Sequence, residues 1–206
     1  MSRVCWECNR AIEPAVDACP ACGAVQPLSP DLSYFDVLGV RQQFEVDLVA
    51  LERSFKDLSR RFHPDRFATA DARARKISLS RSTAINDGYR TLKDPMRRAA
   101  YLLKRLGVDV GRQDAGGPRL PPNFLMQAME EREALADARA AGDPGKVRAL
   151  AAATEAARRT AVEEMARAFA GGAPTAAAEA FLRVRYHDRL LDEVSAWEDD
   201  LQAAHA

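Results

Sequence analysis

Hydrophobic residues recur every three or four positions through most of the chain after residue 30. Between residues 47 and 62 they form one stripe of a helix, made of Leu48, Leu51, Phe55, Leu58 and Phe62. Asp47 precedes the stripe as a candidate N-cap. Pro64 ends the helix because it lacks a backbone donor and disfavours helical geometry at the residue before it. The pattern predicts an amphipathic helix over 47–62, followed by a loop.

Six further helical segments follow from the same period and from their start and stop signals. They are residues 31–39, 71–92, 96–106, 122–140, 144–170 and 174–203. Asp31 is the expected N-cap of the first. The last three have short connections and predict an antiparallel three-helix bundle. Residues 108–122 are rich in Gly and Pro and are typical of a linker.

Composition supports helix through the same part of the chain. Ala and Arg are abundant in the 206 residues, whereas Val, Ile and Thr are sparse, so we expect a mostly α protein. No apolar run approaches the roughly 20 residues that span a bilayer. The first residues, MSRVCWEC, lack the apolar core of a signal peptide. We expect no membrane partner and a cytoplasmic protein of bacterial type, or a mitochondrial matrix protein if eukaryotic, with reduced cysteines.

The formal net charge of zero is distributed unevenly along the chain. Residues 1–30 carry two Arg and three acids (−1), residues 31–106 carry 16 Lys/Arg and ten acids (+6), and residues 107–206 carry 12 and 17 (−5). A basic middle and an acidic tail suggest two surfaces for two different partners, although such blocks also arise as ordinary solvated helix faces.

All four cysteines lie within the first 22 residues, in two C-x-x-C pairs: Cys5 with Cys8, and Cys19 with Cys22. Together they match the tetrahedral four-sulfur coordination of Zn²⁺, and the same spacing also suits iron. A closed four-sulfur site leaves no open position, so the metal would be structural and would supply the folding free energy of a segment poor in apolar residues. Two disulfides are the less favoured alternative in a reducing compartment.

A zinc ribbon that binds nucleic acid is a competing interpretation of residues 1–30. This segment is slightly acidic, and four thiolates with one Zn²⁺ add about two further negative charges. Such a surface is poorly suited to phosphate contacts, and we therefore expect no nucleic-acid partner.

The sequence RRFHPDRF (60–67) places His63, Pro64 and Asp65 directly after the basic helix. A His beside an Asp can act as a base with its orienting partner, but adjacent residues on a loop point apart, and no Ser or Cys nucleophile accompanies them. A metal site fails because a third ligand is lacking. From the residues alone, the simplest interpretation is a proline-terminated helix followed by polar loop residues, without catalytic residues.

Several motifs nevertheless resemble one family. A basic helix, a His-Pro-Asp loop and a long helix ending in AINDGYRTLKDP (84–95) are similar to a J domain, the module of DnaJ-type co-chaperones. With YFDVLGV (34–40), AINDGYRTLKDPMRRAAYLL (84–103) and FLMQAMEEREAL (124–135), they resemble HscB, the J-protein of iron–sulfur cluster assembly. The cysteine-bearing front end resembles the form of that family found in mitochondria and some bacteria.

The resemblance implies four parts: a tetracysteine module with its connector (1–30), a J domain (31–107), a linker (108–122) and a scaffold-binding bundle (123–206). It implies a protein without enzymatic activity or bound nucleotide, whose J domain docks on a DnaK/HscA-type chaperone and stimulates its ATPase. The implied chaperone-binding residues are His63, Pro64, Asp65, Arg53, Lys56, Arg60, Arg61 and Arg66.

The resemblance also assigns the tail to an IscU-type scaffold. Its scaffold-binding patch matches one face of the first tail helix, made of Leu125, Met126, Met129, Glu130 and Glu133. It extends to Tyr186 of the last helix, where family members usually carry Phe or Leu. Without the resemblance, Leu125 and Met129 would be interpreted as bundle core. Methionines suit a surface that must accept and release a partner.

The predicted function is a co-chaperone that delivers the scaffold to the chaperone and promotes cluster transfer. One alternative is a general J-protein acting on unfolded clients, which is disfavoured because no Gly/Phe-rich linker or second zinc module is present. The nucleic-acid-binding zinc ribbon is the second alternative.

Overall fold

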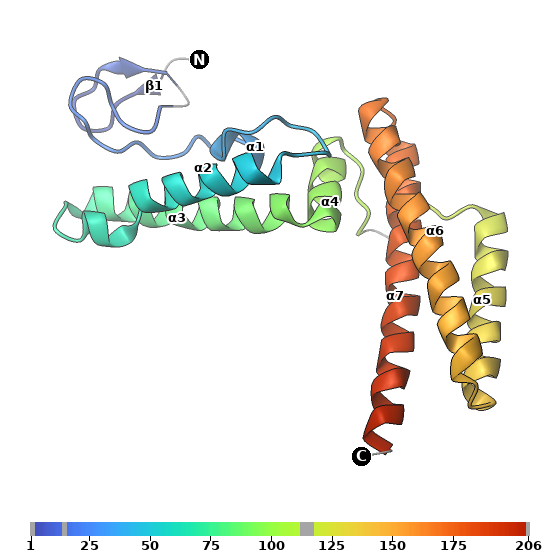
Figure 1. Cartoon of the computed structure of the whole chain (residues 1–206). Helices are drawn as coiled ribbons and strands as arrows, with labels where there is room; N and C mark the ends of the chain where they lie inside the picture. Colours follow the sequence, from blue (N-terminus) through green and yellow to red (C-terminus); the bar gives the residue numbers. More distant parts are fainter. Residues whose placement is uncertain (1–2, 14–15, 112–117, 205–206) are drawn as a thin grey trace. The chain divides into compact units, whose positions relative to one another are not determined.

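A computed structural model describes residues 3–13, 16–111 and 118–204, and these residues are mostly α-helical, as predicted (Figure 1). Contacts divide the chain into two compact units, residues 1–98 and 99–206. The N-terminal elements are β1 (Arg3–Val4), β2 (Ala11–Ile12), α1 (Tyr34–Val37), α2 (Leu48–Arg61), the 3-10 helix η1 (Pro64–Phe67) and α3 (Ala72–Lys93). They are followed by α4 (Pro95–Arg105), α5 (Pro122–Ala140), α6 (Pro144–Ala170) and α7 (Pro174–Ala204).

The first helix begins two residues later than predicted. Ser33, and not Asp31, is the N-cap of α1: its hydroxyl accepts a hydrogen bond from the Asp36 amide at 3.1 Å, and the Asp36 carboxylate accepts one from the Ser33 amide at 2.8 Å. This reciprocal capping box satisfies two backbone donors, whereas Asp31 lies too far upstream to reach them.

Helix α2 has the predicted N-cap, Asp47, whose carboxylate accepts hydrogen bonds from the amides of Val49 and Ala50 at 2.9 and 3.0 Å. Its buried stripe begins one turn later than predicted, because Leu48, the first residue of the helix, is 51% exposed while Leu51 is fully buried. The helix lies alongside α3 (Figure 1). Phe55 stacks on Tyr89 of α3 with ring centroids 4.0 Å apart, which fixes the pair.

Gly88 allows α1 and α3 to approach closely. A Cβ atom at this position would lie 3.2 Å from Cδ1 of Leu38 and 3.3 Å from Cδ1 of Tyr34. Leu38, the C-cap of α1, is fully buried and has little room to move. The α1–α3 contact therefore depends on the absence of a side chain at residue 88.

The C-terminal unit contains the predicted antiparallel three-helix bundle. Helix α6 packs along α7, and α5 lies beside α6 (Figure 1). Side chains of α5 share one core with those of α6 and α7. The shared core consists of Leu135, Ala138, Val147, Leu190, Val194 and Trp197. Ion pairs tie the helices at the surface, among them Arg183 of α7 with Glu164 of α6 at 2.6 Å.

The segment before the bundle is only partly described. Of the predicted linker, residues 112–117 lie outside the described part of the chain. The boundary between the two compact units falls within α4, so the domain limits derived from the sequence stay a prediction. Among the described helices, none has the length and apolar character needed to cross a bilayer.

We expect Gly88→Val to destabilise the N-terminal unit by about 1–3 kcal/mol, because the added methyl groups overpack the α1–α3 contact. Chemical denaturation followed by circular dichroism measures the change. Thr83→Val, at an exposed position of the same helix, is the matched control and should change stability by less than about 0.5 kcal/mol. Equal effects of the two substitutions would contradict the packing argument.

Candidate functional site

Two similar turns present the four cysteines. In the first, the Asn9 amide donates to the Cys5 carbonyl at 3.0 Å, and in the second the Gly23 amide donates to the Cys19 carbonyl at 2.8 Å. Asn9 and Gly23 each follow the first cysteine of their pair by four residues, and both have positive φ, 58° and 75°. These are residue types that tolerate the left-handed conformation, so each C-x-x-C segment closes into a tight turn.

The four sulfur atoms fit one tetrahedral metal ion. They lie within 4.8 Å of one another, with Cys5 and Cys22 at 3.7 Å and Cys8 and Cys19 at 3.7 Å. A tetrahedron with metal–sulfur bonds of about 2.3 Å has sulfur–sulfur edges of about 3.8 Å. All four cysteines are free, and a disulfide would require about 2.05 Å, so the disulfide alternative is wrong for this structure.

The protonation of the thiols agrees with a cation-binding site. Burial raises the pKa of the Cys5 thiol, but hydrogen bonds from the backbone amides of Cys8 and Glu7 outweigh it and lower the pKa to about 6. At Cys22 the backbone amide of Ala24 favours the thiolate, whereas burial and the neighbouring sulfurs raise the pKa to about 12. Four adjacent thiolates repel one another, and a divalent cation relieves that repulsion.

The predicted loop after α2 contains a short 3-10 turn, which begins within the His-Pro-Asp triplet. His63 is the N-cap of η1, and its Nδ1 accepts a hydrogen bond from the Asp65 amide at 3.3 Å. Pro64 occupies the first position, where its fixed φ suits a helix start. The His63 and Asp65 side chains face each other, with Nδ1 and Oδ2 3.4 Å apart, so the expectation that they point apart is wrong. Both remain exposed to solvent.

The basic residues of α2 are exposed, but three of them have acidic neighbours. Lys56 pairs with Glu52 at 2.8 Å and Arg60 with Asp57 at 2.5 Å, both within the helix. Arg61 pairs instead with an acid of the tetracysteine module. Exposed ion pairs of this kind contribute little to stability. Lys56 and Arg60 can therefore leave their acidic neighbours and pair with another protein at little cost in stability.

Arg53 and Arg66 have a different environment. Both are exposed, and neither forms an ion pair with a described residue. Arg53 precedes the His-Pro-Asp triplet in the sequence and Arg66 directly follows it, so each adds a positive charge on one side of the triplet.

The predicted face of α5 is exposed and apolar. Leu125, Met126 and Met129 are 48%, 65% and 73% exposed, so the interpretation of Leu125 and Met129 as bundle core is wrong. Glu130 and Glu133 follow on the same helix and are also exposed. Neighbouring exposed apolar side chains of this size are uncommon outside interaction surfaces.

Tyr186 of α7 lies against the same end of α5. Its hydroxyl donates a hydrogen bond to the Ala128 carbonyl at 2.7 Å, and its ring meets Phe124 edge-on with centroids 5.4 Å apart. Burial raises the pKa of Tyr186 to about 12. Tyr186 is only partly buried, so it supports the α5 face and still reaches the surface.

Comparison with known proteins gives consistent matches. A family described as "HSCB C-terminal oligomerisation domain" matches residues 120–195. The co-chaperone protein HscB homolog of Burkholderia cenocepacia is 38% identical over 170 residues, which cover 82% of this chain and 96% of the relative. The chain belongs to the HscB co-chaperone family. The HscB homolog of Aeromonas salmonicida is 35% identical over 172 residues, covering 82% of this chain and 98% of the relative.

Solved structures of HscB proteins match the fold as well. The crystal structure of human co-chaperone protein HscB has a TM-score of 0.81 and 27% identity, and covers 95% of this chain and 98% of the human one. The chaperone HscB from Vibrio cholerae has a TM-score of 0.68 and 37% identity, covering 82% and 99%. The human structure thus accounts for more of the present chain, although its sequence is less similar.

The structure brings the HscB-type residues into three separate groups. The four cysteines cluster, the His-Pro-Asp turn follows the basic helix α2, and the exposed residues of α5 share one end with Tyr186. Sequence reasoning missed Phe124, whose ring contacts both Tyr186 and His187 edge-on, with centroids 5.4 and 5.7 Å away. The sequence did contain a clue: Phe124 begins the segment FLMQAM and lies one helical turn before Ala128, whose carbonyl accepts the hydrogen bond from Tyr186.

We expect the reduced protein to bind about one equivalent of zinc, as measured by elemental analysis after removal of free metal. Cys19→Ser should lower the content to near zero and unfold the module, because the metal supplies its folding free energy. Glu13→Gln, which removes an exposed acid of the same module, should bind zinc like the wild type. Less than about half an equivalent of zinc or iron in the wild type would exclude a closed four-sulfur site.

Proposed function

We propose that this HscB-family protein binds an IscU-type iron–sulfur scaffold with its C-terminal bundle and delivers it to a DnaK/HscA-type chaperone, whose ATPase it stimulates. The observation that carries the proposal is the pair of exposed surfaces: a His-Pro-Asp turn after a basic helix in one unit, and an apolar face on α5 in the other. The family relation supports co-chaperone function.

The chaperone-binding surface would consist of His63, Pro64 and Asp65 with the basic side chains around them. The ring of Pro64 fixes the turn. Because Nδ1 of His63 accepts from the Asp65 amide, the exposed imidazole can donate a hydrogen bond from Nε2, and the exposed Asp65 carboxylate can accept one. Arg53, Lys56, Arg60, Arg61 and Arg66 would steer the turn towards an acidic surface by long-range attraction. The hydrolysed bond belongs to the chaperone's ATP, so this chain acts on another protein's active site.

The scaffold-binding surface would be the α5 face with Tyr186. Leu125, Met126 and Met129 offer apolar area to a partner, and the flexible methionines can adapt to its shape. Glu130 and Glu133 add an acidic border that selects for a basic neighbour. Phe124 packs behind this face, between α5 and α7, and keeps Tyr186 in place.

Carrying both surfaces on one chain would join the two binding events. A scaffold held by the bundle stays near the chaperone engaged by the J domain, which raises its effective concentration beside the ATPase. Zinc, held by Cys5, Cys8, Cys19 and Cys22, would be structural in this scheme and would stabilise the fold of the N-terminal module.

His63→Gln should reduce stimulation of a DnaK/HscA-type ATPase by about tenfold at sub-saturating concentration, the effect of losing roughly 1.4 kcal/mol of docking energy. The steady-state ATPase rate is the measurement. Thr69→Ala, at an exposed position just after η1, is the control and should behave like the wild type. Undiminished stimulation by His63→Gln would refute the assignment of the turn.

Met129→Asp should weaken scaffold binding at least about tenfold, because it places a charge in an apolar interface. Isothermal titration calorimetry with the purified scaffold gives the affinity. Ala152→Asp places the same charge on an exposed position of another helix, α6, and should bind normally. Both variants should keep scaffold-independent ATPase stimulation. Wild-type affinity in Met129→Asp would place the scaffold elsewhere, and binding of arbitrary unfolded peptides at this face would favour a general J-protein.

A further inference from the structure

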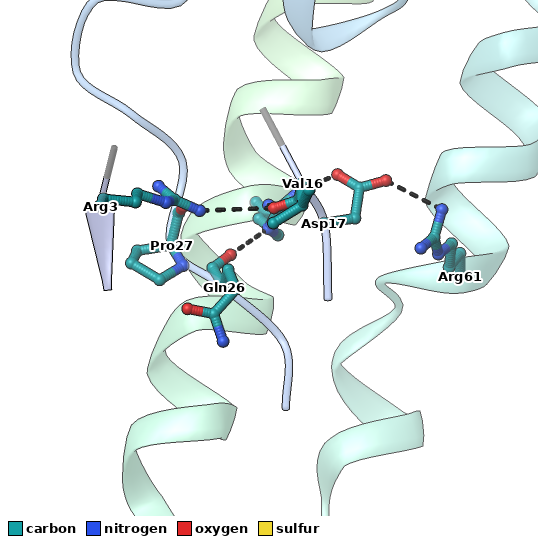
Figure 2. Close-up of polar contacts among 7 residues, drawn as sticks. Arg3, Val16, Asp17, Gln26, Pro27 and Arg61 are labelled. Atoms are coloured by element: carbon teal, nitrogen blue, oxygen red, sulfur yellow. Dashed lines mark hydrogen bonds and ion pairs between the residues drawn. The ribbon is translucent and has the colours of Figure 1, made fainter. Parts of the chain in front are cut away.

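Asp17 of the tetracysteine module is shared by two arginines of the neighbouring helices. Its Oδ1 accepts from Nη1 of Arg81 on α3 at 2.6 Å, and its Oδ2 from Nη1 of Arg61 at the end of α2 at 2.8 Å. Figure 2 shows the Asp17 carboxylate reaching from the module towards Arg61. Arg81 is buried and Asp17 is partly buried, so water screens this contact less than it would an exposed ion pair.

The two arginines enclose the residue that precedes the His-Pro-Asp turn. The guanidinium carbons of Arg61 and Arg81 lie 5.2 and 4.6 Å from the ring centroid of Phe62, which is 2% exposed. The Phe62 carbonyl also accepts a hydrogen bond from the Ser78 hydroxyl at 3.0 Å. His63 follows directly, so the orientation of Phe62 sets where the turn begins.

Gln26 joins this arrangement to the cysteine cluster. Its backbone carbonyl accepts from Nε of Arg81 at 2.6 Å, and its side-chain amide donates to Sγ of Cys5 at 3.2 Å. Gln26 is 1% exposed, so both hydrogen bonds are shielded from water. Arg3 adds a brace within the module by donating to the Pro27 carbonyl at 2.8 Å (Figure 2). The fold of the cysteine turns and the position of Asp17 are therefore coupled.

We propose that Asp17 is a positioning residue for the His-Pro-Asp turn: the folded tetracysteine module, acting through Asp17, holds Arg61 and Arg81 around Phe62 and so fixes the end of α2. Unfolding of the module releases Arg61 and loosens the turn. The proposal gives the module a role beyond its own stability. Its consequence for ATPase stimulation rests on the proposed function above, whereas its structural part does not.

Hydrogen exchange measured by mass spectrometry on the free, reduced, zinc-loaded protein tests the structural part. Asp17→Asn removes the shared charge, and peptides covering residues 58–67 should exchange about tenfold faster than in the wild type, as expected for loss of a hydrogen-bonded charge pair. Glu13→Gln, which removes an exposed acid from the same module, should leave these peptides unchanged. Zinc content should stay near one equivalent in both variants.

Chelation of the metal provides a second measurement that does not depend on the folding of a variant. In the wild type, a chelator should accelerate exchange of residues 58–67 at least to the rate seen in Asp17→Asn, because unfolding the module also removes the Gln26 carbonyl from Arg81. The proposal is overturned if Asp17→Asn retains zinc and exchanges like the wild type, or if chelation leaves these residues unchanged. If Asp17→Asn fails to retain zinc, the chelation result on the wild type decides.

Chaperone stimulation tests whether the order of the turn matters for docking. Asp17→Asn should lower the maximal stimulation of the ATPase about threefold or more, while Glu13→Gln keeps the wild-type value. If exchange accelerates and stimulation does not change, Asp17 holds the turn but the order of the turn does not matter for docking, which overturns the consequence for ATPase stimulation and leaves the structural part standing. If the wild type itself gives no stimulation, the proposed function fails while the exchange result still stands.

Discussion

Arg81 places a guanidinium inside the N-terminal unit, at 3% exposure. Burial lowers its pKa against the opposing effect of Asp17, and a buried charge is costly unless it is paired and hydrogen-bonded. Its partners are the Asp17 carboxylate, the Gln26 and Val16 carbonyls and the Phe62 ring. Three of the four come from the tetracysteine module, so the helices around Arg81 depend on a segment that the two cysteine turns hold in shape.

The same chain separates rigid support from surfaces available to partners. The bundle core of Leu135, Val147 and Trp197 fixes three helices and leaves the methionines of α5 exposed. In the N-terminal unit, the packing of α2 on α3 leaves the cations and the His-Pro-Asp turn at the surface. Both surfaces are built from side chains that the folded cores do not need, which is the arrangement expected of a protein that connects two others.

Periodicity predicted the helices because each buries one apolar stripe, and the cysteine spacing predicted the four-sulfur cluster because C-x-x-C turns are local. The pairing of Asp17 with Arg81 could not be predicted, since it joins residues 64 positions apart. The sequence did indicate that Arg81 is buried. It lies four residues after Ile77 and four before Ile85, which are both buried, so its charge falls on the buried face of α3. The side-chain approach of His63 to Asp65 depends on a 3-10 turn that proline alone does not specify.

The two exposed surfaces on one chain should allow both partners to bind at the same time. Mass photometry of the full chain mixed with the ATP-bound chaperone and the purified scaffold measures this. One complex is expected, whose mass equals the sum of one copy of each of the three proteins and which forms only when this chain is present. Two separate binary complexes that never combine, with each partner displacing the other, would contradict this expectation.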